Sequence, residues 1–335
     1  MKDTEAKRID LAAFDQDQEQ EAATYVIDLS KDYPAPAYLL HINGVGVIPR
    51  GDIQAVKAKS KNGKSYLCTL FSAAILGCSD FGLRASEPGS VLYFDTEQNE
   101  RNTARMAKRV HRLMGWHTNE NREELRFYTR RKMMTADRLP YVEEETRQHQ
   151  PAAVIVDGIA DLCPSFNDEV SSDAAIQALM RLSAECNCAV ICVLHTNKGT
   201  DDNNMKGHLG TLLLQKSSDV FMVQKSKDTF NVTLTESRNA GELAFSFQLD
   251  REGNPIPAEN PEEKFLREAS ALFGAFFHHS FEEKGTAAEL RKWVCQVFEA
   301  SDRQADRIVA KAIEAEIIER RGRGIYALKR PPQPT

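Results

Sequence analysis

The feature that most constrains the fold is the ten-residue run VKAKSKNGKS at positions 56–65. An apolar run, Ile53–Val56, leads into it, and apolar residues at helical spacing follow over 66–76. A strand, a tight loop and a helix N-terminus in this order gather backbone N–H groups at the positive end of a helix dipole. Such a nest of donors suits nucleotide phosphates, so the sequence predicts a nucleotide-binding strand–loop–helix unit.

The loop matches the pattern G-x-x-x-x-G-K-[ST] except at its first position, where Ala58 replaces glycine. Glycine can adopt positive φ more easily than alanine, but such a loop need not have positive φ at this position. Gly63 lets the backbone approach a phosphate closely, Lys64 is expected to reach the β- and γ-phosphates, and the Ser65 hydroxyl is expected to ligate Mg²⁺. The predicted ligands are therefore ATP and Mg²⁺. The alternative is a lysine-rich surface turn before a helix. The predicted nucleotide contacts are Ala58, Lys59, Ser60, Lys61, Asn62, Gly63, Lys64, Ser65 and Tyr66.

Length and composition exclude several classes of protein. The 335 residues allow one large domain and a small one, and 41% hydrophobic and 27% charged residues are ordinary for a soluble protein. A net charge of -6 argues against coating nucleic acid through overall basicity. No apolar run reaches the roughly 20 residues of a membrane span, and the charged N-terminus lacks a signal segment, so we expect a cytoplasmic protein with no membrane partner.

The seven cysteines include no C-x-x-C pair, and most of them lie in apolar runs. This pattern is typical of reduced thiols in a core rather than of disulfides or a zinc site. Metal binding by Cys186 and Cys188 is the alternative.

Apolar strand-like runs alternate with helical stretches, which predicts an α/β fold with a mostly parallel sheet and helices on both faces. Asn43-Gly44 between two apolar runs predicts a hairpin ahead of the phosphate loop. The later strands are expected to be antiparallel and to extend one edge of the sheet. Predicted strands are 91–94, 125–128, 152–156, 189–194, 219–224, 230–237 and 243–249, and predicted helices are 100–114, 136–148 and 172–186.

The chain divides into four predicted parts. Residues 1–35 are an acidic N-terminal arm, 36–250 form the α/β core, and 251–264 form a linker rich in proline and charge. In residues 265–330, three helical patterns are followed by a hairpin with a glycine-containing turn, which is typical of a winged helix-turn-helix domain.

Two carboxylates follow predicted strands of the sheet. Asp157 follows the buried strand Ala-Ala-Val-Ile-Val, where a carboxylate can hold Mg²⁺ beside a phosphate loop; the alternative is a cap on the turn. Glu97 follows the strand 91–94, at the edge where parallel α/β sheets bind ligands, and is the predicted catalytic base, with Asp95 as a second candidate. Alternatively, this segment is a helix N-terminus capped by Asp95 or Thr96.

His195 ends the strand 189–194 and is predicted to sense the γ-phosphate and to pass its state to the next loop; a purely structural role is the alternative. That loop, 199–210, is polar, contains glycine and is predicted to be mobile. Around it, Lys198, Lys206 and His208 are predicted to contact a nucleic-acid backbone, against the alternative of a solvated connection.

The phosphate loop, Glu97, Asp157, His195 and the glycine-bearing loop occur in the order found in RecA-fold ATPases. Over about residues 36–250 the chain resembles RepA/DnaB-type hexameric replicative helicases, which occur on plasmids and mobile elements. The resemblance implies a RecA-like core and a homo-oligomer, expected as a hexamer, with ATP and Mg²⁺ between subunits. It also implies DNA as the partner, single-stranded in a central channel.

In that family an arginine from the adjacent subunit completes the site, within a K-x-R-N-G-like segment. The similar segment here, residues 236–241, keeps Arg238, which the resemblance makes the catalytic arginine in trans. Glu236 stands at the lysine position, so a second cation is not expected there. An edge-strand charge that discourages aggregation is the alternative role for Arg238.

Arg320, Arg321 and Arg323 cluster near the predicted wing and are expected to contact DNA, although a winged helix can instead dock proteins. We therefore expect an ATP-dependent DNA motor, a helicase by resemblance, that serves replication or mobilisation of a mobile element. One alternative is a DNA-binding regulator in which ATP only switches assembly and no duplex is unwound. A small-molecule kinase is a third possibility, but we identify no acceptor pocket for it.

Overall fold

The computed structural model describes residues 27–33, 35–197, 203–258, 269–277, 284–298 and 301–329. Most of the predicted acidic arm, and Lys198 with the following four residues, lie outside these ranges. Between residues 27 and 37 the described chain forms one turn, where the Lys31 amide donates to the Asp28 carbonyl over 3.0 Å.

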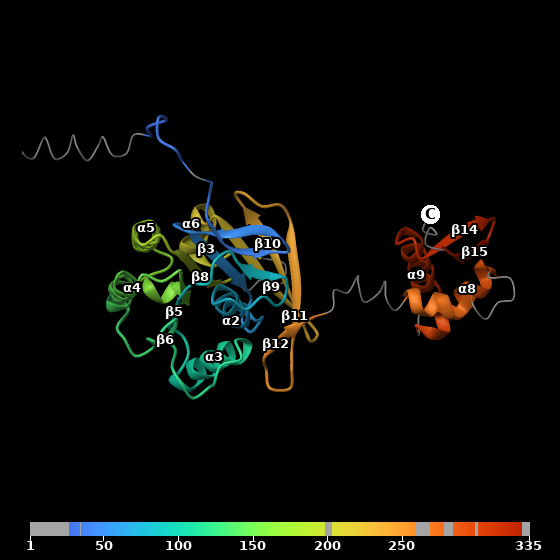
Figure 1. The fold of residues 1–335 in the computed structure, drawn as a ribbon, viewed down its shortest axis with the longest axis horizontal. Helices are drawn as coiled ribbons and strands as arrows, with labels where there is room; N and C mark the ends of the chain where they lie inside the picture. The colour runs from blue at the N-terminus through green and yellow to red at the C-terminus, as the bar shows by residue number, and fades with distance from the viewer. Residues whose placement is uncertain are drawn as a thin grey trace, which may run out of the picture. The chain divides into compact units, whose positions relative to one another are not determined.

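A nine-stranded sheet forms the centre of the core (Figure 1). The six strands from β9 to β6 are parallel, and β10, β11 and β12 continue one edge in antiparallel pairing. This confirms the predicted α/β class, with a mostly parallel sheet and antiparallel edge strands. In spatial order the strands are β12 (Pro255–Pro257), β11 (Leu243–Leu249), β10 (Thr229–Ser237), β9 (Asp219–Ser226), β3 (Ile53–Ala58), β8 (Ala189–His195), β7 (Ala153–Asp157), β5 (Val91–Asp95) and β6 (Leu125–Thr129).

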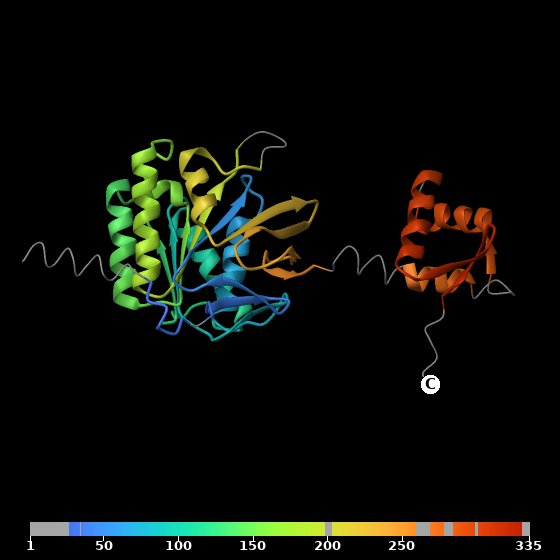
Figure 2. The same cartoon turned by 90° about the horizontal axis from the view of Figure 1, so that it is seen from above.

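Helices cover both faces of the sheet, as Figure 2 shows from a second direction. One hydrophobic cluster joins the sheet to α2 (Lys64–Ile75) and α3 (Glu100–Leu113). A second cluster joins the opposite face to the other helices of the core. These are η1 (Ile159–Leu162), α4 (Thr135–His149), α5 (Glu169–Glu185) and α6 (Gly207–Lys216).

Side-chain alternation along the strands decides which groups meet the phosphate-loop helix. In β7, Ala153 and Ile155 pack on the α2 side, whereas Val154 and Val156 pack on the opposite side. Because side chains alternate strictly along a strand, Asp157 at the end of β7 also faces α2. Strand β5 follows the same rule and is in register with β7, so its last residues pair with those of β7.

The predicted hairpin at Asn43-Gly44 is confirmed by β1 (Tyr38–Ile42) and β2 (Val45–Pro49). Both turn residues have positive φ, 50° and 84°, as a tight two-residue hairpin turn requires. The hairpin does not join the main sheet. It pairs with the short strand β4 (Leu83–Ala85), which the sequence did not predict, and packs on the α2 side.

Two segments differ from the sequence expectation. The sheet continues beyond residue 250, because β12 (Pro255–Pro257) pairs with β11 inside the segment predicted as linker; an edge position tolerates its prolines. The predicted mobile loop 199–210 is also shorter than expected, because α6 begins at Gly207. Leu209 and Leu213, one helical turn apart, are fully buried in the cluster that includes α5, and this burial outweighs the local glycines.

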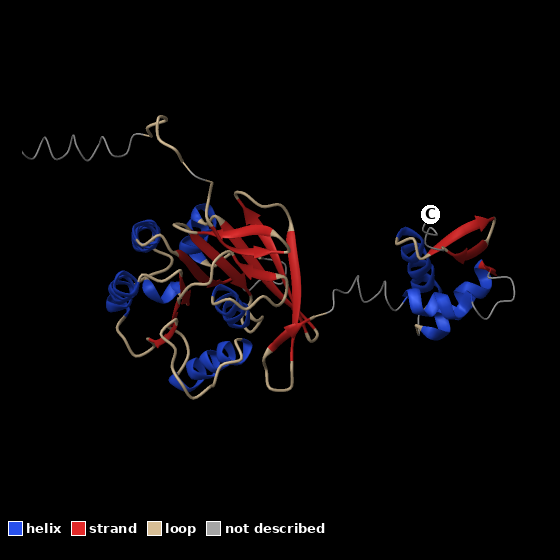
Figure 3. Cartoon of the chain, in the orientation of Figure 1, coloured by secondary structure: helices blue, strands red, loops and turns tan. Residues whose placement is uncertain are grey.

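Residues 269–329 have a hydrophobic cluster of their own, centred on Phe273, Phe277, Leu290 and Val294. Residues 269–277 are helical, and two further helices follow them (Figure 3). Both following helices begin with capping boxes, which stabilise their first turns. The predicted sequence of helices and then a hairpin is therefore present. These elements are β13 (Lys284–Thr286), α8 (Ala287–Val297), α9 (Asp302–Glu314), β14 (Ile318–Gly322) and β15 (Ile325–Leu328).

Within the described ranges, no helix is long and apolar enough to cross a membrane. All seven cysteines are free thiols. The described residues also contain no group of three or more His, Cys, Asp or Glu side chains arranged to hold a metal, and this includes the surroundings of Cys186 and Cys188.

The burial of α5 generates a stability prediction. Leu179 is fully buried and Val170, on the same helix, is 77% exposed. We expect Leu179→Ala to lower the free energy of unfolding of the core by about 2–5 kcal/mol, because it leaves a cavity. Val170→Ala should change it by less than about 0.5 kcal/mol. Urea denaturation followed by circular dichroism measures both variants, and equal losses would contradict the packing described here.

Candidate nucleotide site

The phosphate loop connects the end of β3 to the first turn of α2. Gly63 is the N-cap of α2 with φ 93°, a conformation that favours glycine, and a Cβ there would clash with the ring of Phe230. Lys61 also has positive φ, 64°, whereas Ala58 does not. The alanine at the first position of the pattern therefore costs the loop no backbone strain.

Asp157 and Ser65 face each other at the start of α2. The Ser65 hydroxyl donates to Asp157 Oδ2 over 2.7 Å, and the Tyr93 hydroxyl donates to the same oxygen over 2.6 Å. Burial raises the pKa of Asp157, and these two hydrogen bonds oppose the rise. A serine hydroxyl and a carboxylate side by side are the oxygen donors that Mg²⁺ prefers, so the pair fits a magnesium site.

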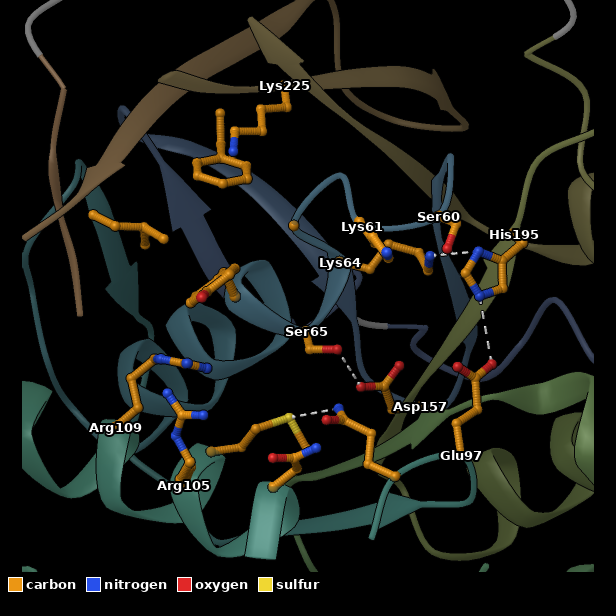
Figure 4. Close-up of a pocket in the computed structure, with 17 residues that line it drawn as sticks. Ser60, Lys61, Lys64, Ser65, Glu97, Arg105, Arg109, Asp157, His195 and Lys225 are labelled. Atoms are coloured by element: carbon orange, nitrogen blue, oxygen red, sulfur yellow. Dashed lines mark hydrogen bonds and ion pairs between the residues drawn. The ribbon is translucent and has the colours of Figure 1, made fainter. Parts of the chain in front are cut away.

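His195 lies between Lys64 and Glu97 and bonds to both, as Figure 4 shows. Its Nδ1 is 2.8 Å from Lys64 Nζ, and its Nε2 is 3.5 Å from Glu97 Oε1. Because an ammonium only donates, Nδ1 accepts from Lys64, and the ring proton is then on Nε2 and directed at Glu97. The histidine therefore connects the lysine of the phosphate loop to the predicted base.

Charge and burial act together on these groups. The hydrogen bond from His195, with the positive charge of Lys64, holds the pKa of Glu97 below its usual value in spite of partial burial. Burial lowers the pKa of Lys64, and the neighbouring Asp157 and Glu97 oppose this effect. The carboxylate of Glu97 is thus ionised near neutral pH and available to a water molecule.

Asp95 has a structural environment rather than a catalytic one. Its Oδ1 accepts from the backbone amides of Glu97 and Gln98, and its Oδ2 accepts from the Thr103 hydroxyl. Both oxygens are thus occupied within the fold, and Asp95 fixes the turn that carries Glu97. The alternative interpretation, in which Asp95 or Thr96 caps the helix, is wrong. The N-cap of α3 is Asn99, whose side chain accepts from the Asn102 amide.

One cleft of about 560 Å³ brings these residues together. Lys64, Ser65, Glu97, Asp157 and His195 all line it, and it falls within the usual 300–1,000 Å³ range of small-molecule sites. The cleft combines a loop of backbone donors, a buried cation and a pair of oxygen ligands. These groups fit a triphosphate with Mg²⁺.

Sequence reasoning missed several residues that line the other end of the cleft. Arg105 and Arg109 project from α3, with the Arg109 guanidinium 4.1 Å from the centre of the Tyr66 ring. Lys225 on β9 lies over Phe230 of β10, 5.3 Å from the ring centre. The four-residue spacing of the arginines was a usable signal, because it places both on one helix face. No local sequence pattern indicates Lys225 or Phe230. These residues lie near the phosphate loop only because of the order of the strands in the sheet.

Other predicted site residues lie elsewhere. Arg238 follows β10 at the end remote from the phosphate loop, where its Nη2 donates to the Lys216 carbonyl over 3.2 Å. Lys206 places Nζ 4.7 Å from the centre of the Phe166 ring. His208 is half-buried, and Lys198 lies outside the described residues. The arginines near the predicted wing, Arg320, Arg321 and Arg323, are exposed.

The raised pKa of Asp157 generates a prediction for the nucleotide-free protein. A carboxyl group whose pKa is higher in the folded than in the unfolded protein stabilises the folded state when it is protonated. This stabilisation is complete below the unfolded pKa of about 3.9 and is lost as the pH rises through the folded pKa. We therefore expect Asp157→Asn, which keeps an acceptor for Ser65 and Tyr93, to melt at or above the wild-type temperature at pH 8. The difference should shrink toward pH 4. Thermal melts across pH measure this, and a lower melting temperature for the variant at pH 8 would contradict it.

Comparisons with known proteins place the chain in a family. The family model described as "AAA domain" matches residues 16–201, a range that contains Lys64, Glu97, Asp157 and His195 and ends before Arg238. Among solved structures, one described as an ATPase domain is similar, with 14% sequence identity, a TM-score of 0.48, and coverage of 76% of this chain and 100% of that one. No curated protein matches. The family match covers more than half of the sequence, so the chain belongs to the AAA domain family and is a P-loop ATPase.

Proposed function

We propose that the chain is an oligomeric, ATP-driven motor acting on DNA, a helicase or translocase of the RepA/DnaB-like type that serves replication or mobilisation of a mobile element. One observation carries the catalytic part of this proposal. The Lys64–His195–Glu97 chain and the Ser65–Asp157 pair face the same cleft. The resemblance to the helicases supports the choice of DNA and of a hexamer.

The residues of the cleft have separate roles in ATP hydrolysis. Lys64 and the N–H groups of the loop bind the phosphates of ATP, and Ser65 and Asp157 hold Mg²⁺. When bound, the metal neutralises charge on the phosphate oxygens. Glu97 orients a water molecule and accepts its proton, and Asp95 keeps the Glu97 turn in place through two backbone hydrogen bonds.

His195 connects the state of the nucleotide to the rest of the core. Its side chain bonds Lys64, which must turn to the phosphates when ATP binds, so nucleotide binding competes with this hydrogen bond. Its backbone carbonyl accepts from the amide of Lys206, the N-cap residue of α6, over 3.0 Å. A shift of His195 therefore acts directly on α6 and on the segment before it, where the DNA contacts of Lys198, Lys206 and His208 are proposed.

Arg238 is proposed to act in trans. Strand β10 runs antiparallel to β9, and Ser237 pairs with Asp219 at the start of β9. The following Arg238 thus lies at the edge of the sheet opposite the phosphate loop of its own chain, and only a second copy of the chain can bring this side chain to the γ-phosphate. Such an arginine makes hydrolysis depend on assembly.

The function is tested by ATP hydrolysis with and without single-stranded DNA, followed by a duplex-unwinding assay, with Lys64→Ala as the inactive control. We expect DNA to stimulate hydrolysis and the wild type to separate strands. Stimulation without unwinding would reduce the proposal to a translocase or loader. Hydrolysis that does not respond to DNA would contradict a DNA motor.

Glu97→Gln tests the base. We expect it to lower kcat for ATP by about 10²–10⁴-fold with little change in nucleotide affinity, because glutamine keeps a partner for His195 but cannot take a proton. Glu144→Gln, on the exposed side of α4, is the matched control and should keep wild-type turnover. Phosphate release and binding of a fluorescent nucleotide measure the two quantities. A variant with wild-type kcat would remove Glu97 from this role.

Mixing two inactive variants tests the arginine. Arg238→Ala and Lys64→Ala should each lower hydrolysis by about 10³-fold or more. Mixed subunits should recover activity, because about a quarter of randomly formed interfaces join an intact Lys64 site to an intact Arg238. Steady-state hydrolysis against mixing ratio measures the recovery. A mixture that stays as inactive as its components would contradict action in trans.

The C-terminal part favours a second candidate function. Residues 269–329 combine helices with a hairpin whose exposed Arg320, Arg321 and Arg323 suit phosphates, as expected of a winged-helix DNA-binding domain. A regulator that uses ATP only to switch assembly on duplex DNA would have the same parts. ATP-dependent duplex binding without hydrolysis would favour the regulator over the motor.

A further inference from the structure

A second cavity, of about 420 Å³, lies against the phosphate loop. Lys59 and Asn62 of that loop line one side of it. Thr196, directly after β8, and Asn203, just before α6, line another side. The remaining polar side chains come from β9 and β10, namely Gln224, Lys225, Ser226 and Asn231. The predicted nucleotide contacts Ala58, Lys59 and Asn62 line this cavity rather than the nucleotide cleft, and no step of hydrolysis proposed above uses it.

Thr196 has a buried hydroxyl with no bonding partner. The residue is 6% exposed, and its Oγ1 makes no hydrogen bond to any residue that the structure describes. An unpaired buried hydroxyl is destabilising, and a protein rarely retains one without use. The backbone amide of Thr196 donates to the Ala58 carbonyl over 3.1 Å, so the hydroxyl is held at a fixed place beside the phosphate loop.

The lining of the cavity matches one chemical class of ligand. Its polar side chains are hydroxyls, carboxamides and ammonium groups, and the lining residues that the structure describes include no acidic and no aromatic side chain. The Asn231 oxygen already accepts from the Ser246 hydroxyl at 2.7 Å, so its amide N–H groups remain for an acceptor. Hydroxyl, amide and ammonium donors are those that contact nucleic-acid phosphates, and the described lining offers no aromatic ring on which a nucleobase could stack.

We propose that this cavity binds a backbone phosphate of the single strand on which the motor acts, with the Thr196 hydroxyl as a central donor. The inference rests on the proposed function. It adds a site that shares the phosphate loop with ATP, because Lys59 and Asn62 belong to one site and Lys64 and Ser65 to the other. Thr196 also follows His195 directly, so a strand phosphate in the cavity contacts both elements that hold the nucleotide.

Thr196→Val tests the proposal, because valine keeps the shape and removes the hydroxyl. Two measurements are made on the full chain with saturating nucleotide and Mg²⁺: affinity for a fluorescent oligo-dT strand, and the melting temperature without DNA. We expect strand affinity to fall about tenfold or more, since one hydrogen bond to a charged group is lost. The melting temperature should stay the same or rise, because an unpaired buried hydroxyl has been removed.

Thr146→Val is the matched control, since Thr146 is fully buried and its hydroxyl already donates to the Val142 carbonyl over 2.7 Å. It should leave strand affinity unchanged. An abasic oligonucleotide should show the same loss as oligo-dT with Thr196→Val, because the contact is to phosphate. Inorganic phosphate alone is the competing source, and it should displace the strand only weakly.

The outcomes distinguish a failure of this phosphate site from a failure of the proposed DNA motor. If wild type binds strands and Thr196→Val binds them equally well, the inference is overturned while the motor stands. A loss seen with oligo-dT but not with the abasic strand overturns the phosphate assignment. A variant that loses inorganic phosphate yet keeps both strands overturns the strand as occupant. If wild type binds no single strand, the proposed function itself fails, and this inference fails with it.

Discussion

The hydrogen bond between Ser65 and Asp157 is the contact on which the site depends, because it joins the first turn of α2 to the end of a strand far along the chain. It follows from the period-two alternation of β7, which turns Ala153, Ile155 and then Asp157 toward α2. A shift of one residue in the register of β7 would place the carboxylate on the opposite face. Tyr93 reaches the same carboxylate oxygen because β5 obeys the same alternation in register with β7.

Stability and function oppose each other at this point of the fold. Burial raises the pKa of Asp157 and lowers the pKa of Lys64, so both charged forms are held where water would solvate them better. Their mutual attraction and the hydrogen bonds of Ser65, Tyr93 and His195 offset part of this cost. A site of this kind is completed by a ligand that carries both negative phosphate and a cation, which is the charge pattern of ATP with Mg²⁺.

Much of the fold and the centre of the site could be predicted because their signals are local. Gly63, Lys64 and Ser65 are consecutive in one sequence motif, and strands of the parallel sheet are continuous apolar runs that place Asp157 at a strand end. The contact of Phe230 with Gly63 could not be predicted. Phe230 is on β10, and it reaches the loop only because the sheet places β10 beside β9 and β9 beside β3. The helix α6 was missed since burial of two leucines, a tertiary effect, outweighs its glycines. The unpaired hydroxyl of Thr196 is likewise visible only from the packing around it.

Lys64 and Asp157 are proposed to act on one magnesium-bound triphosphate, and the magnesium dependence of ATP affinity is the decisive measurement. Calorimetric titration of a slowly hydrolysed ATP analogue, with Mg²⁺ and with EDTA, would be compared for wild type, Lys64→Met and Asp157→Asn. We expect Lys64→Met to weaken binding in both conditions, whereas Asp157→Asn should weaken it only when Mg²⁺ is present. Equal weakening by Asp157→Asn in EDTA, or wild-type affinity of this variant in Mg²⁺, would show that Asp157 does not hold the metal of the bound nucleotide.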